Sequence, residues 1–483
     1  MLTSECLAKI FKAVISFVLL QSLRRRELRE ENRASPSPLL TISIVHHRRF
    51  SPSSTTELLQ QSFHVFIISL VIGPSPAIPS HPRIRTTTMD LKKSVRCQQD
   101  VALTIAKHLF LKQEYQAKNL VFSPLSLFTV FSVMAAGSED HALDQLLSFL
   151  QFDSIHNLIA FFSQLVSSAL FSDDRICFIN GMWVDESLPL SHSFKQLVAT
   201  HYNTTLASVD LKTKGDQACR EINLWVEKET NGVITKLLHP SMLRKLTELV
   251  FANAMCFKGV WKHKFSDIAF PASFHLFNGT KVTAPFMHSE QSEHFIGIFD
   301  GFKVLRLSYQ QGSDKTRRFS MYIFLPDAKD GLLALIEKLA SESDFLKDKF
   351  PRRKVEVRQF AIPKFKISFS LEASNVLHEL GMVSPFFLTK VVEGTNSKLY
   401  VESIYHNAFI EVNDKGTIAS ASTLMLNKRG SRRATPTDFV ADHPFLFLIR
   451  EDFSGTIFFI GQVLNPLDGA DEPTSLVYRR HTP

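Results

Sequence analysis

The fold is decided close to the C-terminus, by the stretch Phe439-Val-Ala-Asp-His-Pro-Phe-Leu-Phe-Leu-Ile449 and, a few residues later, by Thr456-Ile-Phe-Phe-Ile-Gly-Gln-Val-Leu464. Phe445–Ile449 and most of Thr456–Leu464 are apolar runs, which are typical of strands buried on both faces. Between them, Glu451-Asp-Phe-Ser-Gly455 supplies polar residues and a glycine for a tight connection. These residues predict a buried β-hairpin.

Helical patterns lie upstream of this hairpin. One helical face is marked by apolar residues spaced four apart: Val101, Ile105 and Leu109. A second helix is indicated by Ile222 and Val226, and Asn231-Gly232 after it has the residue types that end helices in a left-handed conformation. Helices early and strands late predict an α+β fold and not the βαβ alternation of nucleotide-binding proteins.

The composition is that of a globular protein, because 45% of the 483 residues are hydrophobic and 21% are charged. The net charge is +8, and residues 1–88 hold 11 Lys/Arg against 5 Asp/Glu, so most of the excess lies in this N-terminal part. A nearly neutral remainder argues against a nucleic-acid-binding surface. No apolar run reaches the ~18 residues of a membrane span. We therefore expect no nucleic acid and no membrane among the partners.

The chain divides into three parts by composition. Residues 1–88 alternate short apolar runs with Arg-rich and Ser/Pro-rich stretches and are expected to be a basic, poorly ordered extension. Residues 89–467 form the predicted folded domain, and residues 468–483 a C-terminal extension. The first apolar run only weakly resembles a signal peptide, which leaves both the extracellular space and the cytoplasm open as locations.

Enzyme and metal motifs are absent from the sequence. It contains no G-x-S-x-G, H-E-x-x-H, Walker A or G-x-G-x-x-G pattern. Asp442 and His443 are adjacent, so in a strand their side chains would lie on opposite faces and could not form a catalytic pair. The cysteines lack zinc-ligand spacing and are predicted to be free thiols: Cys6, Cys97, Cys177, Cys219 and Cys256. We expect no catalytic residues, no metal and no cofactor.

Residues 411–438 form an unusually long connection for a compact domain. Thr417–Thr423 contains only small or β-branched residues, with no charge, proline or glycine, so it is suited to become an interior strand. The following half is basic, with Lys428, Arg429, Arg432 and Arg433. This half is interpreted either as bait for a protease with an acidic specificity pocket or as a flexible basic loop.

The rest of the chain resembles the serpins, and most closely their plant branch (serpin-Z-like), over about Ser94–Leu467. Five segments carry the resemblance in the family's order: Asn119–Ser126, Ile222–Ile234, Asn253–Trp261, Pro285–Met287 and Phe439–Ile449. It implies a single-domain fold with about nine helices, three β-sheets and an exposed reactive-centre loop at about 411–438.

The resemblance also implies an activity. A serpin is cleaved in its reactive-centre loop, forms a covalent complex with the protease and inserts the cut loop into its main sheet. The basic loop predicts Arg/Lys-specific serine proteases as partners, with cysteine proteases of the same specificity as a further target, and the inhibitor itself is expected to be a monomer. The alternative is a serpin cleaved as a plain substrate, with a storage, binding or scaffold role. Ile418, where inhibitory members usually carry Glu, and a shortened loop motivate that alternative.

Four groups of site residues follow from the resemblance. The hinge of the loop comprises Gly416, Thr417, Ala419, Ser420, Ala421, Ser422 and Thr423.

Strict family spacing places the reactive bond between Gly430 and Ser431, and a loop one residue shorter places it between Arg429 and Gly430. Cleavage after Arg429 is favoured because glycine offers a specificity pocket no side chain, and Lys428, Arg432 and Arg433 stay open as further cleavage points. The shutter, a polar cluster beneath the central strands, is assigned to Ser123, Ser126, Asn253 and His406. The breach, where the loop enters the sheet, is assigned to Lys258 and Trp261.

Overall fold

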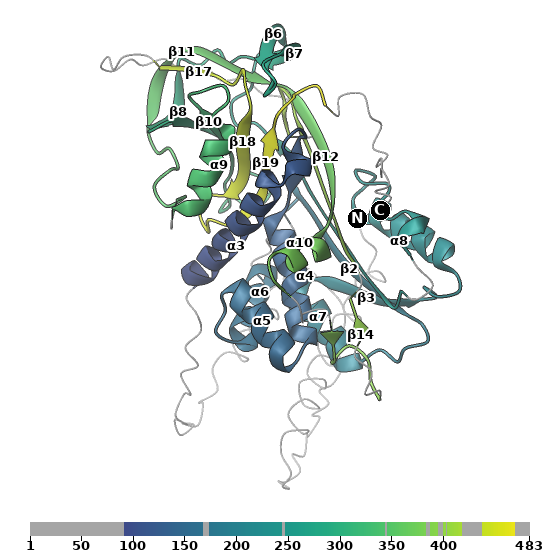
Figure 1. The fold of residues 1–483 in the computed structure, drawn as a ribbon. Helices are drawn as coiled ribbons and strands as arrows, with labels where there is room; N and C mark the ends of the chain where they lie inside the picture. The colour runs from purple at the N-terminus through teal and green to yellow at the C-terminus, as the bar shows by residue number, and fades with distance from the viewer. Residues whose placement is uncertain are drawn as a thin grey trace, which may run out of the picture. The chain divides into compact units, whose positions relative to one another are not determined.

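Helices and strands are both abundant in the computed structural model, which confirms the predicted α+β class (Figure 1). The structure describes residues 91–167, 173–243, 247–342, 345–382, 387–394, 399–401, 403–417 and 437–468. All of these belong to one unit, residues 85–483. The described residues contain eight α-helices and three sheets, against the nine helices and three sheets expected. Among them, no helix has both the length and the hydropathy needed to cross a membrane.

The two helices predicted from apolar spacing both form. The first is α3 (Leu91–Leu111), in which Val101, Ile105 and Leu109 are buried. The second is α8 (Gly215–Glu229), and the two residues after its cap, Asn231 and Gly232, have positive φ angles as predicted. The remaining helices are α4 (Pro124–Gly137), α5 (Asp140–Leu150), α6 (Ile155–Ser167), α7 (His192–Tyr202), α9 (Leu332–Ser341) and α10 (Ala373–Glu379).

The larger sheet contains the predicted hairpin. β18 (Phe445–Glu451) and β19 (Ile457–Val463) pair antiparallel, with Phe445 opposite Val463. The sheet order continues from β19 to β1 (Leu120–Phe122), and from β18 through β10 (Phe319–Pro326), β9 (Phe302–Ser308), β8 (Glu293–Phe299), β11 (Lys354–Pro363) and β7 (Lys281–Met287) to β6 (Phe270–His275). β17 (Thr437–Val440) pairs in parallel with β11.

The second sheet contains the first residues of the long connection that the sequence singled out. Its order is β3 (Thr204–Val209), β2 (Ile176–Asp185), β4 (Leu249–Phe257), β15 (Ser403–Val412), β16 (Gly416–Thr417) and β5 (Gly259–Val260), and β12 (Phe365–Glu372) pairs with β15. A third sheet consists of β13 (Phe387–Leu388) and β14 (Leu399–Tyr400).

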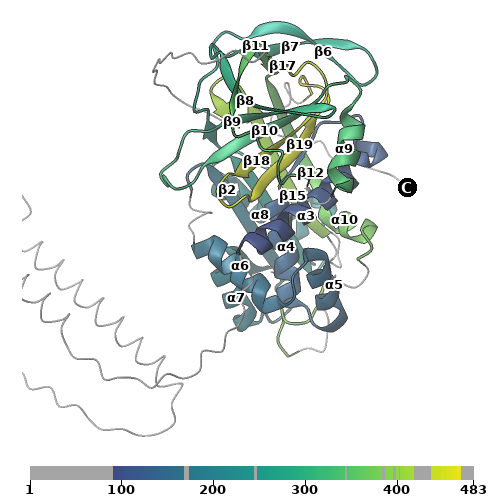
Figure 2. The ribbon, with the colours of Figure 1, turned by 90° about the vertical axis from the view of Figure 1, so that its left-hand side faces the viewer.

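Helix α4 packs between the two large sheets. Every one of its residues is buried, and it contacts both β4 and β19. It begins after Ser123, whose side chain accepts a hydrogen bond from the Ser126 amide, and Pro124 occupies the first turn, where no amide donor is needed. Helices α5, α6 and α7 gather around it at one end of the unit, and β6, β7, β11 and β17 lie at the other end (Figures 1 and 2).

Candidate functional site in the seven-stranded sheet

The centre of the second sheet is closed by a direct pairing of β4 with β15, which we call the seam. Ser403–Phe409 of β15 pairs in parallel with Val250–Cys256 of β4. Most residues of both strands are buried, because helix α4 covers part of one face and the hydrophobic residues around α8 cover part of the other. Over this length nothing separates the two strands.

Beyond the seam a short strand already lies between the same two edges. β16, the first two residues of the predicted hinge, pairs antiparallel with Val412 of β15 and with β5, the continuation of β4. Thr417 is fully buried, and its Oγ1 lies 2.8 Å from the Tyr309 hydroxyl. Gly416 has no room for a side chain, because a Cβ there would lie 2.0 Å from the carbonyl oxygen of Gly259. The first two residues of the predicted hinge therefore lie inside the sheet.

The turn that leads into β16 is held by the predicted breach tryptophan. The Trp261 Nε1–H donates to the Asn413 carbonyl (2.8 Å), and its amide donates to the Lys415 carbonyl (3.1 Å). The indole stacks on Tyr309, with ring centroids 4.5 Å apart, and Lys364 forms an ion pair with Asp414 in the same turn. Trp261 thus fixes the start of the hinge.

Lys258, the other predicted breach residue, lies at the end of β4. Its amide donates to the carbonyl of Arg175 (2.6 Å). Arg175 in turn forms a buried ion pair with Asp173 (2.6 Å) and lies over the Phe319 ring. Lys258 is thus held through its backbone, and the residue is half-buried.

The structure brings the four predicted shutter residues into one buried hydrogen-bonded cluster beneath the seam. The Ser123 amide donates to His406 Nε2 (3.0 Å), so the ring proton must be on Nδ1, which donates to Asn253 Oδ1 (2.7 Å). Ser126 Oγ donates to the same Asn253 oxygen. Asn253 and His406 are directly opposite in the seam, one on each strand. The cluster therefore joins β4, β15 and helix α4.

Burial keeps the His406 imidazole neutral. It lowers the pKa of His406 to about 3, because no solvent reaches the ring to stabilise the charged form. The neutral ring acts as both acceptor and donor, as the cluster requires. Both ring nitrogens take part in hydrogen bonds of the cluster, which suits the structural role expected for this histidine.

Sequence reasoning missed two members of this site. Asn180 on β2 accepts a hydrogen bond from Asn253 Nδ2 and so extends the cluster to a third strand; the signal was a single Asn within the otherwise apolar run of β2. Tyr309, which contacts Thr417, comes from the end of β9 in the other sheet. No spacing in the sequence pairs Tyr309 with Thr417.

The remaining predicted residues fall into two groups. Ala419, Ser420, Ala421, Ser422, Thr423, Arg429, Gly430 and Ser431 lie outside the described residues, as do nearly all of the predicted extensions. Asp442 and His443 require a correction, because Asp442 Oδ1 lies 2.7 Å from His443 Nδ1. They lie in an irregular segment between β17 and β18, so the opposite-face rule for strands does not hold. His443 Nε2 also contacts the Pro326 carbonyl (2.8 Å), and this places the pair in a structural turn.

Comparisons with known proteins bear on the family and the fold. Residues 96–466 match the sequence model of the family described as Serpin (serine protease inhibitor). Serpin-ZX of Arabidopsis thaliana is 44% identical over 393 residues, which are 78% of this chain and 100% of the relative. Serpin-Z7 of Hordeum vulgare is 42% identical over 395 residues, 79% of this chain and 98% of the relative. A solved Arabidopsis serpin in its native stressed conformation is similar with a TM-score of 0.71 and 43% identity, covering 78% of this chain and 99% of that one.

Proposed function

The chain belongs to the serpin family of protease inhibitors, which are not enzymes, and from this premise we propose that it traps Arg/Lys-specific serine proteases as a suicide substrate. The observation that carries the proposal is the position of β16. The chain that follows Thr417 begins between β15 and β5, directly above a seam with no other strand in it. A strand continued from this point is already in register to enter the sheet.

The chemistry proposed is an interrupted acyl transfer. The protease serine attacks the Arg429 carbonyl carbon, the amine of Gly430 leaves, and an ester joins the serine oxygen to Arg429. Hydrolysis of that ester would complete ordinary cleavage. Insertion of the cut loop before water attacks leaves the ester intact and displaces the protease.

The energetics favour insertion once the loop is cut. β4 and β15 run parallel, and β16 runs antiparallel to β15 and to β5. A strand continued from Thr417 would therefore replace one parallel ladder by two antiparallel ladders, and antiparallel pairing is slightly more stable per residue. The small residues of Thr417–Thr423 suit this path because their side chains need little room.

The choice of Arg429 rests on side-chain chemistry. An acidic specificity pocket gains an ion pair with Arg429 and nothing from the neighbouring Gly430. Extracellular and intracellular proteases share this preference, and cysteine proteases of the same specificity are proposed as further targets on the same grounds. In the substrate-type alternative, the protease cleaves the same bond, but the cut loop does not insert into the sheet.

The test is to mix the full chain with trypsin, separate the products on a denaturing gel, and sequence the released C-terminal peptide. We expect a stable band near the summed masses and a peptide that begins at Gly430. A peptide that begins at Ser431 would move the reactive bond to Gly430. Cleavage without a stable band, repeated with a Lys/Arg-specific cysteine protease, would establish the substrate-type alternative.

A matched pair of variants sharpens this test. Arg429→Ala should lower the rate of complex formation with trypsin by about 100-fold or more, because the specificity pocket loses its charged partner. Arg432→Ala, three residues along the same basic stretch, is the control and should leave the rate within about twofold of the unchanged protein. The reverse result would place the reactive bond after Arg432.

A further inference from the structure

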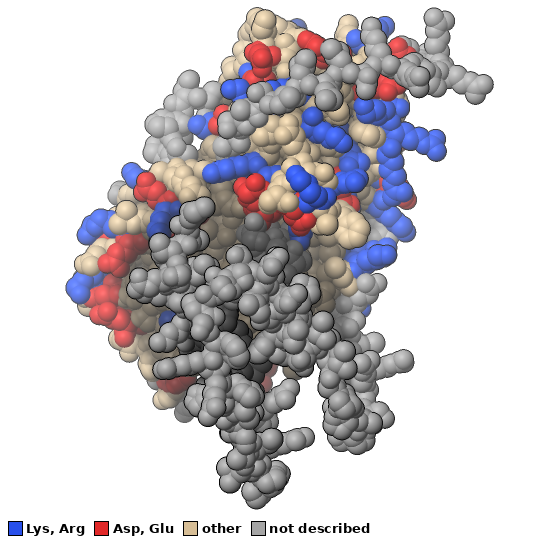
Figure 3. Space-filling view, turned by 180° about the vertical axis from the view of Figure 1, so that it is seen from behind, with Lys and Arg blue, Asp and Glu red and all other residues tan. Residues whose placement is uncertain are grey.

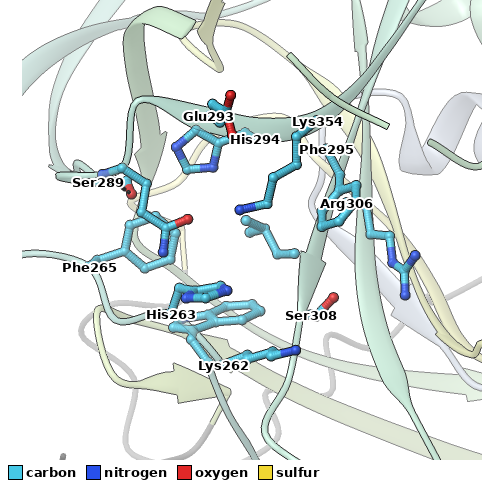
Figure 4. Close-up of a pocket in the computed structure, with 13 residues that line it drawn as sticks. Lys262, His263, Phe265, Ser289, Glu293, His294, Phe295, Arg306, Ser308 and Lys354 are labelled. Atoms are coloured by element: carbon cyan, nitrogen blue, oxygen red, sulfur yellow. Dashed lines mark hydrogen bonds between the residues drawn. The ribbon is translucent and has the colours of Figure 1, made fainter. Parts of the chain in front are cut away.

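A small cavity lies beside the breach and shares Trp261 with it (Figure 4). Trp261, Lys262 and His263, which follow β5, form one wall, and residues of β8, β9 and β11 form the others. Its volume is about 60 Å³. Since about 10–15 Å³ of such volume accommodates one water molecule, the space suits a group of four or five heavy atoms.

Positive charge converges on this cavity. In Figure 4 the Lys354 ammonium points into the space between the rings of His294 and His263, and Lys262 lies at its edge near Ser308. Among the described residues, neither lysine has a carboxylate within ion-pair distance, whereas Arg306 is paired with Asp452 (2.5 Å) and points away. Glu293 is the one carboxylate in the lining, and it is exposed.

The same face of the unit carries many further cations. Figure 3 shows Lys and Arg side chains gathered over the end of the unit that contains β8, β10 and β11. Exposed Arg352 and Arg353 directly precede Lys354 in the sequence. Positive charge spread over this part of the surface raises the local concentration of anions.

A buried polar atom in the cavity lacks a partner. His294 is 7% exposed, and among the described residues its Nε2 has no hydrogen-bond partner. Its ring is fixed by stacking on Phe360, with centroids 3.9 Å apart. A buried polar atom left unpaired costs about 1–3 kcal/mol, and in the protonated ring Nε2 would donate a hydrogen bond to an anion placed beside it.

We propose that this cavity is a binding site for one tetrahedral oxyanion group, a phosphate or a sulfate. Lys354 and Lys262 supply the charge, and the rings of His294 and His263 donate hydrogen bonds to the oxyanion when they are protonated. A tetrahedral oxyanion has five heavy atoms and oxygens on all sides, which matches both the volume and the spread of donors around it. The proposal is independent of whether the chain inhibits proteases.

Protonation links this site to pH. The pKa of His294 is lowered to about 4, chiefly by burial and to a smaller extent by the positive charges of Lys354 and His263, against a hydrogen bond to the Gln291 backbone that raises it. An anion beside the ring would favour the protonated form, so binding takes up a proton and tightens as pH falls from 7 toward 5. The other charged groups facing the cavity are Lys262 and the exposed Glu293.

The occupied cavity would also stabilise the start of the hinge. Trp261 forms part of the wall and donates its Nε1–H to the turn before β16. Lys262 donates its amide to the Ser308 carbonyl (2.9 Å), next to Tyr309, which contacts Thr417. A ligand bound to the folded state alone raises its thermal midpoint by mass action.

The test is isothermal titration calorimetry of the full chain with inorganic phosphate at constant ionic strength. We expect one site per chain. Lys354→Met keeps the apolar stem and removes the charge, and it should weaken binding about tenfold or more. Lys281→Met, an exposed lysine on β7 outside the cavity, is the matched control and should leave binding unchanged. Absence of binding at millimolar phosphate, or equal weakening in both variants, would overturn the site.

Two further measurements define the ligand. Sulfate does not titrate between pH 7 and 5, so any change in its affinity over this range reports protonation of the protein. The affinity for sulfate should rise as pH falls in the unchanged protein, and it should rise less in the His294→Gln variant. Equal pH dependence in both proteins would remove His294 from the site. Titration with glucose 6-phosphate distinguishes the source: binding comparable to phosphate indicates a group carried by a larger molecule, and binding of phosphate alone indicates the free ion. Both results support the site.

Discussion

Strand β15 is bordered in two different ways along its length. At one end its neighbour is β16, the two-residue start of the hinge, held by Tyr309 and by the turn at Asn413. Along the seam its neighbour is β4, sealed by the buried cluster around His406 and Asn253. The same sheet therefore already contains an extra strand, β16, at one end of β15, whereas along the seam β15 pairs directly with β4.

Loop insertion has two requirements, and the two ends of β15 meet them separately: the new strand must start in the correct register, and β4 and β15 must part. The end of the sheet that contains β16 sets the register of the inserting strand, because Gly416 and Thr417 are placed between β15 and β5 before any cleavage. The buried cluster around His406 and Asn253 opposes the separation of β4 and β15, because each of its hydrogen bonds must be broken and remade when the strands part. Under the proposed mechanism, changes at the end that contains β16 alter whether the loop enters, and changes in the cluster alter how firmly the sheet stays shut.

The largest effect is expected from Thr417→Arg. Thr417 is fully buried, and an unpaired charge there costs several kcal/mol, so the hinge must leave the sheet. Formation of the covalent complex with trypsin should fall by more than about 100-fold, while cleavage of the loop continues. A denaturing gel separates the two outcomes.

The matched control is Thr283→Arg, at an exposed position on β7. It introduces the same charge outside the seam and should leave complex formation unchanged. If the Thr417 variant still traps trypsin as well as this control does, then β16 is not the point from which the strand extends.

A smaller effect is expected from the cluster and is visible through pH. Unfolded His406 binds a proton below about pH 6.5, whereas the folded residue stays neutral down to about pH 3. Its contribution to stability is thus fully present above pH 6.5 and is lost as pH falls through this window, with a slope of up to about 1.4 kcal/mol per pH unit. His406→Gln should lower the free energy of unfolding at pH 7 by about 1–3 kcal/mol and reduce this slope.

The measurement is the urea midpoint of the full chain at several pH values between 7 and 4. His141→Gln, at an exposed position on α5, controls for the loss of a histidine that the solvent can reach. Buried His294 remains in all three proteins, so its own titration cancels from the comparison. An unchanged slope in the His406 variant would show that this ring has the same pKa in the folded and unfolded protein.

Sequence reasoning was most successful where structure is local. The hairpin of β18 and β19 and the helices α3 and α8 were predicted from apolar spacing and turn residues, because each is decided within about twenty residues. The shutter residues were reachable only through the family resemblance. Composition and spacing alone could not bring Ser123 next to His406, which lies far along the chain.

The parts that sequence reasoning missed are contacts between distant elements. Tyr309 reaches Thr417 from the other sheet, and Asn180 joins the cluster from β2. The Asp442–His443 contact was missed for the opposite reason, since a strand was assumed where the backbone is irregular. The charged cavity is built from four separate segments, and no pattern in any one of them indicates it.

The smallest effect is expected from Tyr309→Phe, which tests how β16 is held. The substitution removes one buried hydrogen bond, to Thr417 Oγ1 (2.8 Å), and keeps the ring that stacks on Trp261. It should lower the free energy of unfolding by about 1 kcal/mol and speed hydrogen exchange at the Thr417 amide. Thr417→Val should cost a similar amount. The double variant should cost less than the sum of the two, because neither hydroxyl is then left without its partner. Strict additivity would mean that the two groups do not interact and that pairing with β15 and β5 alone holds the hinge.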